Sequence, residues 1–229
     1  EGILFNPEDM RDSDIATMAI GQSIAVTPLQ LVTAMAAIAN DGILMKPHIV
    51  RSVRNADGSV YEETKPEEVR RVIESVTDKT LVGLLEQVVA TGGGSKAQVA
   101  GYRIAGKTGT AQKADLDRGG YMDGHYIASF CGFAPVEDPR LVLLVVIDDP
   151  SGIYYGGQVA APVGSRIFSQ LLRYLHVEPS SDPFAGQNPG KSTPPEAPGT
   201  GSRVVVPSVL GLDAAEASLR LEAAGLKIE

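Results

Sequence analysis

A lysine and two threonines stand close together in the segment GYRIAGKTGTAQ, which runs from residue 101 to residue 112. Lys107 supplies a positive charge that can bind a carboxylate or assist proton transfer. Thr108 and Thr110 can donate hydrogen bonds, and a backbone N–H at this point can stabilise an oxyanion. Gly109 would let a ligand approach the backbone closely. These residue types are typical of acyl-transfer chemistry at a serine.

The same segment also fits a phosphate-binding loop, with Gly101, Gly106, Lys107 and Thr108 at the required spacing. The apolar run 141–149 ends in acid, as a magnesium-binding strand would. A phosphate loop, however, needs a buried strand before it and a helix after it. The residues inside the supposed loop are bulky and strand-forming, and a glycine interrupts any helix that could follow. We therefore interpret the segment as a strand.

Three strands are expected around this segment, over 99–111, 126–133 and 141–147. Their connectors are short, which favours antiparallel neighbours. Alternation along the first strand puts the lysine and Gly109 on one face and the two threonines on the other. A helix is expected from Ala161 to Leu175, with its apolar face formed by Val163, Ile167, Leu171 and Tyr174. The predicted fold class is α+β, an antiparallel sheet flanked by helices and incomplete at its N-terminal side.

Two further helices are expected upstream of the strands. The first follows Thr27 as N-cap, has Gln30 as its capping-box partner, and stops at Gly42. Its apolar stripe consists of Leu31, Met35 and Ile38. The second is expected to begin after Thr77 as N-cap and to end in the glycine run 92–94, which suits a loop beside a site. Between the two helices, the turn signal NADG predicts a hairpin, and EEVRRVIES predicts a short strand.

Composition excludes several classes of function. The net charge of −8 argues against a nucleic-acid surface, and the 43% hydrophobic content is that of a globular protein. The single cysteine, Cys131, cannot form an internal disulfide, and a buried small residue is its expected role. Three histidines without ligand spacing predict no metal site, and we expect no cofactor. The longest strongly apolar run, LVLLVVI, is too short to span a bilayer.

The sequence predicts three regions. Residues 1–176 carry the apolar periodicity of a folded domain. Residues 177–202 are rich in Pro, Gly and Ser, and we interpret them as a linker. Residues 203–229 begin a second small domain whose core is too short to be complete.

The first region resembles the penicillin-binding proteins, the serine D,D-transpeptidases that cross-link peptidoglycan. The resemblance is carried by four stretches in order: MAIGQSIAVTPLQLVTAMAAIANDG, AGKTGTAQ, HYIASFCGFAPVEDPRLVLLVVIDDP and YYGGQVAAPV. The end of the chain, VVVPSVLGLDAAEASLRLEAAGLKIE, resembles the first part of a PASTA domain. That combination is most similar to class B enzymes of division or spore formation.

The resemblance implies roles for the residues of the KTGT segment. Lys107 would assist proton transfer and bind carboxylate. Thr108 and Thr110 would hold the carboxylate of a peptide or β-lactam, with Gly109 as part of the same binding strand. The backbone at Thr110 would form half of the oxyanion hole, and Gln112 would lie at the rim.

One family feature is missing from the sequence. The family's nucleophile is the serine of a Ser-x-x-Lys motif, and a Ser-x-Asn motif completes its proton network. Neither motif occurs in the 229 residues. We therefore expect a complementary N-terminal portion that carries both motifs and the membrane anchor, on the extracytoplasmic face of the bacterial membrane. This chain alone would be inactive.

Two other hypotheses remain open from sequence. One is a β-lactam sensor or a non-catalytic cell-wall-binding protein on the same scaffold. The other is the nucleotide hydrolase of the phosphate-loop interpretation, which the flanking residues disfavour. Under the leading hypothesis, the partners are peptidoglycan stem peptides and β-lactams.

Overall fold

The computed structural model describes residues 10–21, 24–115 and 118–180, together with Gly2, Asn6 and Glu8. The chain divides into two units, Glu1–Pro189 and Gly190–Glu229, and every feature described below lies in the first. The elements, in chain order, are α1 Asp12–Met18, α2 Pro28–Ala39, β1 Ile43–Met45, β2 Ser52–Arg54, β3 Val60–Glu63, β4 Glu68–Arg71, α3 Ser75–Ala90, the 3-10 helix η2 Ser95–Ala97, β5 Ala105–Ala114, β6 Tyr121–Ala134, β7 Leu141–Asp148, α4 Gly156–Val159 and α5 Ala161–Tyr174.

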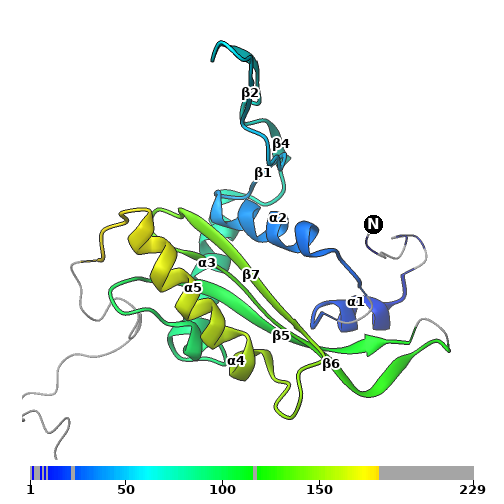
Figure 1. The fold of residues 1–229 in the computed structure, drawn as a ribbon. Coiled ribbons are helices and arrows are strands. Elements are labelled where there is room, and N and C mark those ends of the chain that lie inside the picture. Colours follow the sequence, from blue (N-terminus) through cyan, green and yellow to red (C-terminus); the bar gives the residue numbers. More distant parts are fainter. Residues whose placement is uncertain are drawn as a thin grey trace, which may run out of the picture. The chain divides into compact units, whose positions relative to one another are not determined.

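The central sheet consists of β5, β6 and β7 in that order, and both pairs are antiparallel. The connections are short, so each strand turns back beside its predecessor, as expected from the sequence. β6 is the middle strand, and within the described residues β5 and β7 each have one free edge. Figure 1 shows α5 lying across one face of this sheet. The α+β fold class with an antiparallel sheet is confirmed.

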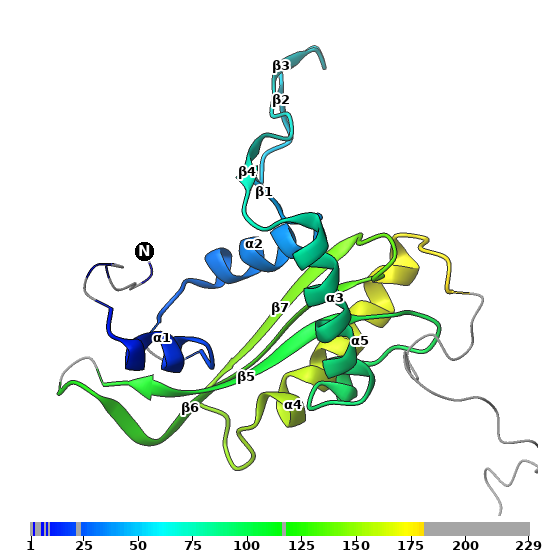
Figure 2. The same ribbon diagram turned by 180° about the vertical axis from the view of Figure 1, so that it is seen from behind.

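Each face of the sheet carries its own apolar core. On one face, Phe130 and Val145 pack with Phe168 and Leu172 of α5. On the other face, Cys131 and Phe133 of β6 pack with Met35 of α2 and Leu85 of α3. Neighbouring residues of β6 point to opposite faces, which places α5 and α2 on opposite sides. Figure 2, seen from behind, shows α3 running along the β5 side of the sheet.

The predicted start of α2 is confirmed. The Thr27 hydroxyl accepts a hydrogen bond from the Gln30 N–H at 3.2 Å, and the Gln30 side chain accepts one from the Thr27 N–H at 2.9 Å. The predicted N-cap of α3 is wrong, because the helix begins at Ser75 with Glu74 as its N-cap. The Ser75 hydroxyl donates to Asp41, so this first turn is fixed by a residue of the preceding helix–strand turn.

The prediction of a strand from residue 99 is also corrected, because β5 begins only at Ala105. Gly101 has a φ of 83°, and the Tyr102 N–H donates to the Val99 carbonyl at 3.1 Å, so residues 99–102 form a tight turn. The strand then runs through Lys107 without interruption. No helix follows it, since the next described element is β6, and this geometry excludes a phosphate loop.

The buried face of α5 agrees only in part with the predicted one. The fully or nearly buried positions are Ala161, Gly164, Phe168 and Leu172. Of the predicted positions, Val163 and Ile167 are partly buried and pack against the core, whereas Leu171 and Tyr174 are 39% and 77% exposed. The helix is rotated by about one residue, because the small Gly164 lets it approach the ring of Phe130 on the sheet. The buried face of α5 therefore depends on how small and large residues pack together, and not only on where the apolar residues lie.

An arm made of two β-ribbons leaves the body between α2 and α3. Strand β1 pairs with β4, and β2 pairs with β3, both antiparallel, which confirms the predicted hairpin and short strand. Figure 1 shows this arm, residues 43–71, extending from the end of α2 away from the sheet. Ser52 is half-buried, whereas the rest of β2 and all of β3 and β4 are exposed.

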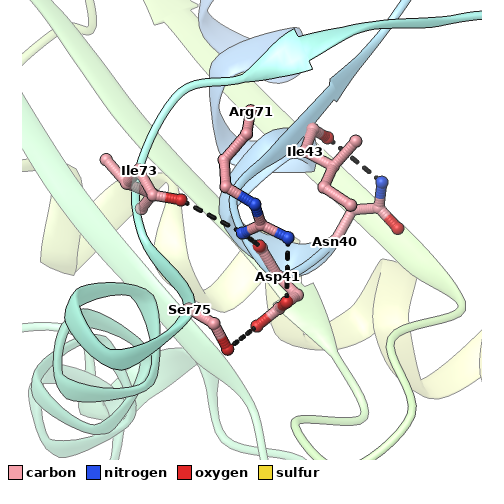
Figure 3. A network of polar contacts seen from close by, with 6 residues as sticks. All are labelled: Asn40, Asp41, Ile43, Arg71, Ile73 and Ser75. Carbon is pink, nitrogen blue, oxygen red and sulfur yellow. Dashed lines mark hydrogen bonds and ion pairs between the residues drawn. The ribbon is translucent and has the colours of Figure 1, made fainter.

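A polar network fixes the root of the arm (Figure 3). The Asp41 carboxylate accepts a hydrogen bond from the Ser75 hydroxyl at 2.6 Å and pairs with the Arg71 guanidinium at 3.3 Å. Arg71 also donates to the Asp41 and Ile73 carbonyls. The Ser75 hydrogen bond, with help from Arg71, holds the pKa of Asp41 below its usual value. The network ties the turn after α2, the end of β4 and the start of α3 together.

A buried carboxyl lies in the first turn of α3. Asp78 is only 3% exposed, and its Oδ1 has no hydrogen-bond partner among the described residues. Burial raises the pKa of Asp78, and the nearby Asp41 carboxylate raises it further. Because its folded-state pKa is raised, Asp78 favours the folded state most below the unfolded pKa, where its carboxyl is neutral in both states. That contribution is lost as the pH rises through the folded value.

We therefore expect Asp78→Asn to raise the free energy of unfolding at pH 7 by about 1 kcal/mol, because it removes a buried charge. The gain should disappear below a pH of about 3.9, where the carboxyl of Asp78 is already neutral in both states. Urea unfolding at pH 7 and pH 3 measures both effects. Asp57 serves as the matched control, because Ser59 lowers its pKa, and Asp57→Asn should not stabilise. Equal gains at both pH values would contradict the assignment.

The last described residues run along the body. The Tyr102 hydroxyl donates to the Val177 carbonyl at 2.7 Å, and the Ser180 N–H donates to the Gly101 carbonyl at 2.7 Å. The rest of the predicted linker 177–202 and the PASTA-like region 203–229 lie outside the described residues.

Candidate active site

The KTGT residues lie on β5, an edge strand within the described part of the chain. Opposite them on β6, Lys107 pairs with Cys131, Thr108 with Phe130, Gly109 with Ser129 and Thr110 with Ala128. Directly opposed residues of an antiparallel pair share a face. The predicted alternation is therefore confirmed, with the lysine on the face of α2 and the two threonines on the face of α5.

Lys107 is exposed, and its ammonium donates a hydrogen bond to the Thr108 carbonyl at 3.0 Å. This contact is local, so the flexible side chain can turn towards a carboxylate that binds along the strand. Cys131, its neighbour on β6, is 5% exposed. Burial raises the pKa of the Cys131 thiol to about 12. The thiol is therefore neutral at physiological pH, and Cys131 is a packing residue, as expected.

The two threonines contact glycine-rich segments on the other face. The Thr110 hydroxyl accepts a hydrogen bond from the Gly156 N–H at 3.0 Å. The Thr108 side chain lies beside Gly93 and Gly157, whose added Cβ atoms would come within 3.9 Å and 3.7 Å of it. The structure thus brings the glycine run 92–94 beside β5, as the sequence indicated.

A side chain at Gly109 would require the Ser129 side chain to move. A Cβ at this position would lie 2.4 Å from the Ser129 hydroxyl oxygen. Gly156 packs on the opposite side of the same strand pair, close to the Gly109 carbonyl. The absence of a side chain therefore lets both faces of the strand be approached closely at this residue.

Gln112 is exposed near the end of β5, opposite Tyr126. The Tyr126 ring stacks on Tyr154 with centroids 3.9 Å apart, and Tyr154 contacts Tyr155 at 4.6 Å. The hydrogen bond between the two neighbouring hydroxyls raises the pKa of Tyr155. Tyr154 is thus a packing residue, and the stack anchors the loop that leads into α4.

An ion pair and a histidine–carboxylate hydrogen bond lie at the same end of the sheet. Lys113 pairs with Asp148 of β7 at 2.8 Å, and this hydrogen bond raises the pKa of the lysine. His125 contacts Asp149 at 2.8 Å. The first contact joins the two outer strands across β6, and the second joins β6 to the turn after β7, so the second lysine of β5 is held by a structural ion pair.

Two features of the site were not predicted as site residues. They are Gly156 and Gly157 of α4, which lie next to the threonines although nearly fifty residues separate them in sequence. The available signal was the pair of glycines after two tyrosines in SGIYYGGQ. Local pattern cannot say which strand such a pair will meet.

Across the described ranges, no group of three or more His, Cys, Asp and Glu side chains could hold a metal ion. In the same part of the chain, no helix has the length and apolarity needed to cross a membrane. The site consists of a cationic side chain, two hydroxyls and backbone groups on an edge strand. It can bind an extended ligand that carries a carboxylate.

Comparison with known families gives this geometry a context. The model for the penicillin binding protein transpeptidase domain matches residues 2–169. The chain belongs to this family. Among curated relatives, stage V sporulation protein D of Bacillus subtilis is 38% identical over 217 residues, covering 94% of this chain and 32% of the relative. Peptidoglycan D,D-transpeptidase FtsI of Escherichia coli is 42% identical over 179 residues, covering 76% and 28%.

Solved structures agree with this family assignment. Penicillin binding protein 3 from Mycobacterium tuberculosis, complexed with ampicillin, has a TM-score of 0.71 and 35% sequence identity. The match covers 80% of this chain and 42% of the mycobacterial chain. This chain spans about a third of the length of the curated relatives it matches.

Proposed function

We propose that this chain is the C-terminal part of a peptidoglycan D,D-transpeptidase that also binds penicillin. The observation that carries the proposal is β5, with Lys107, Thr108 and Thr110 beside a sheet edge that no other described strand covers. Family membership supports the proposal, and the Escherichia coli relative is itself named a peptidoglycan D,D-transpeptidase. The mycobacterial relative was solved with ampicillin and with aztreonam.

The proposed reaction is acyl transfer in two steps. A serine hydroxyl attacks the carbonyl carbon of a D-Ala-D-Ala bond, the C–N bond breaks, and the serine proton leaves with the terminal D-alanine amine. The amine of a second stem peptide then attacks the ester, and the serine takes back a proton as the cross-link forms. A β-lactam stops after the first step, because its leaving amine stays attached through the opened ring.

In this proposal the residues of β5 bind the substrate and stabilise charge. Lys107 assists the transfer of the serine proton and attracts the substrate carboxylate. The Thr108 and Thr110 hydroxyls donate to that carboxylate, and Gly109 gives the substrate backbone room along the strand. The Thr110 N–H is half of the oxyanion hole, and Gln112 borders the site.

The serine itself must come from elsewhere, because the 229 residues contain no Ser-x-x-Lys and no Ser-x-Asn. We infer that a complementary N-terminal portion supplies both motifs and the membrane anchor. This places the site at the extracytoplasmic face of the membrane. We call the protein that joins the two portions the parent protein.

Two surfaces support such a complement. One is the edge of β7 that is free within the described residues. The other is an apolar groove of about 220 Å³ between α2 and the root of the arm, where Leu29 is 60% exposed. Exposed apolar grooves of this kind are typical of surfaces that pack against another part of a protein.

A fluorescent penicillin tests the proposal directly. It should acylate the parent protein and remain on it as a covalent label after denaturation. The 229-residue chain alone should stay unlabelled, because it lacks the nucleophile. Gel fluorescence measures both, with unlabelled penicillin added first as the competition control. An unlabelled parent protein would overturn the transpeptidase assignment, and a labelled isolated chain would show that its own residues supply the nucleophile.

A further inference from the structure

Three glycine-containing segments meet on the face of the sheet that carries the two threonines. They are β5 at Gly109, the loop after α3 at Gly93, and the first turn of α4 at Gly156 and Gly157. Gly156 is buried and Gly157 is half-buried. The first turn of α4 therefore lies between the sheet and the loop.

The fit at Gly156 requires the absence of a side chain. An added Cβ would lie 2.3 Å from the Gly109 carbonyl oxygen and 2.4 Å from the Ser129 carbonyl oxygen. Both neighbours are backbone atoms of paired strands, so they cannot move aside as a flexible side chain would. Glycine at this position lets the backbone of α4 come close enough for its N–H to reach the Thr110 hydroxyl.

A second contact holds the same turn from outside. An added Cβ on Gly157 would lie 2.2 Å from the Gly93 carbonyl oxygen. The Lys96 ammonium of η2 donates to the Gln158 side-chain carbonyl, which links the loop to α4. The position of the Gly156 N–H is thus set from both sides, by the sheet and by the loop.

This N–H constrains what the Thr110 hydroxyl can do. A hydroxyl has one proton to donate and two lone pairs that accept. The Gly156 N–H occupies one lone pair, and the hydroxyl proton cannot point at that donor. It is turned away from α4, where Thr110 is exposed on the edge strand.

We infer that the Gly156 amide is a positioning group that orients the Thr110 hydroxyl as a hydrogen-bond donor to the carboxylate of the bound peptide or β-lactam. The inference rests on the proposed transpeptidase function. Gly156 acts through Thr110 and need not touch the substrate. Its effect is therefore specific to ligands that carry the carboxylate.

The test is the second-order acylation rate of the parent protein with a penicillin and with the methyl ester of the same penicillin. Gly156→Ala should slow acylation by the free acid about 10- to 100-fold, the range expected for losing a hydrogen bond to a charged group. We expect acylation by the ester to be slower in the unchanged protein and to change by less than about 2-fold in the variant. Equal losses with acid and ester would overturn the inference.

A double-mutant cycle separates positioning from general damage. In a Thr110→Val background, Gly156→Ala should cause no further loss with the free acid, because the hydroxyl it positions is gone. Losses that multiply would contradict the inference. Gly42→Ala is the matched control, because its Cβ would lie 2.3 Å from the Ile73 carbonyl oxygen, away from β5. It should lower the melting temperature without changing the preference for the acid.

Hydrogen exchange tests the contact if Gly156→Ala does not fold. The Gly156 amide should exchange at least ~10-fold faster in Thr110→Val than in the unchanged protein, and Thr110→Ser should retain the protection. Unchanged exchange in Thr110→Val would overturn the inference. Failure of the proposed function looks different, because the unchanged parent protein would then not be acylated at all.

Discussion

Replacing Lys107 with alanine in the parent protein is expected to slow acylation by penicillin at least ~10²-fold. The ammonium is exposed on β5, and its hydrogen bond to the Thr108 carbonyl is local enough to be exchanged for a substrate contact. Its loss removes the cation that assists proton transfer and attracts the substrate carboxylate. Stopped-flow or gel measurement of the second-order acylation rate gives the effect.

The same strand offers a matched control. Lys113 is also a lysine of β5, but it pairs with Asp148 at 2.8 Å, so we assign it a structural role. Lys113→Ala should therefore leave acylation within about 2-fold of the unchanged protein. Lys107→Arg keeps the positive charge but cannot lose a proton at neutral pH, so it should restore carboxylate binding without restoring the rate. Near-normal acylation of Lys107→Ala would refute the role assigned to this residue.

Local sequence was sufficient where neighbouring residues fix the structure. The start of α2 depends on Thr27 and Gln30, three residues apart, and their reciprocal hydrogen bonds form as predicted. The KTGT strand could be read in the same way, because the alternation that separates Lys107 from the threonines is a property of the strand itself.

Local sequence failed where a distant residue decided the outcome. Ser75 begins α3, two residues before the predicted cap, and its hydroxyl donates to Asp41, 34 residues earlier. Gly101 turned a predicted strand start into a tight turn, although its left-handed backbone is an option that every glycine carries. Contacts in the tertiary structure determine which of these conformations forms.

The site shows the same division. The candidate ligand-binding residues of β5 could be named from the sequence, but the group that orients Thr110 could not. Gly156 lies 46 residues further along the chain, and its role depends on the close approach of two backbones. Such close approaches leave no periodic pattern in the sequence, and glycine occurs in loops for many other reasons.

The ring of Phe130 is the centre of the core that supports this strand, and Phe130→Ala should lower the free energy of unfolding by about 3–5 kcal/mol. Phe130 is fully buried in the middle strand. Three glycines surround it, and Cβ atoms added to Gly106, Gly132 and Gly164 would approach the ring to 2.8, 3.1 and 2.7 Å. These three positions have no side chains that could fill the cavity, so we expect only partial relaxation of the surrounding core.

Urea unfolding of the 229-residue chain measures this loss. Val146→Ala on the adjacent strand is the control, because Val146 is 45% exposed and its truncation should cost less than about 0.5 kcal/mol.

The packing of α5 on Phe130 predicts that substitutions at Gly164 and Phe130 compensate for each other. Gly164→Ala should destabilise the unchanged chain by about 1–3 kcal/mol, because the new methyl group meets the ring. In a Phe130→Leu background the same substitution should cost clearly less, since the shorter side chain leaves room for the methyl group. Additive costs in this cycle would mean that α5 is held away from the ring by other contacts.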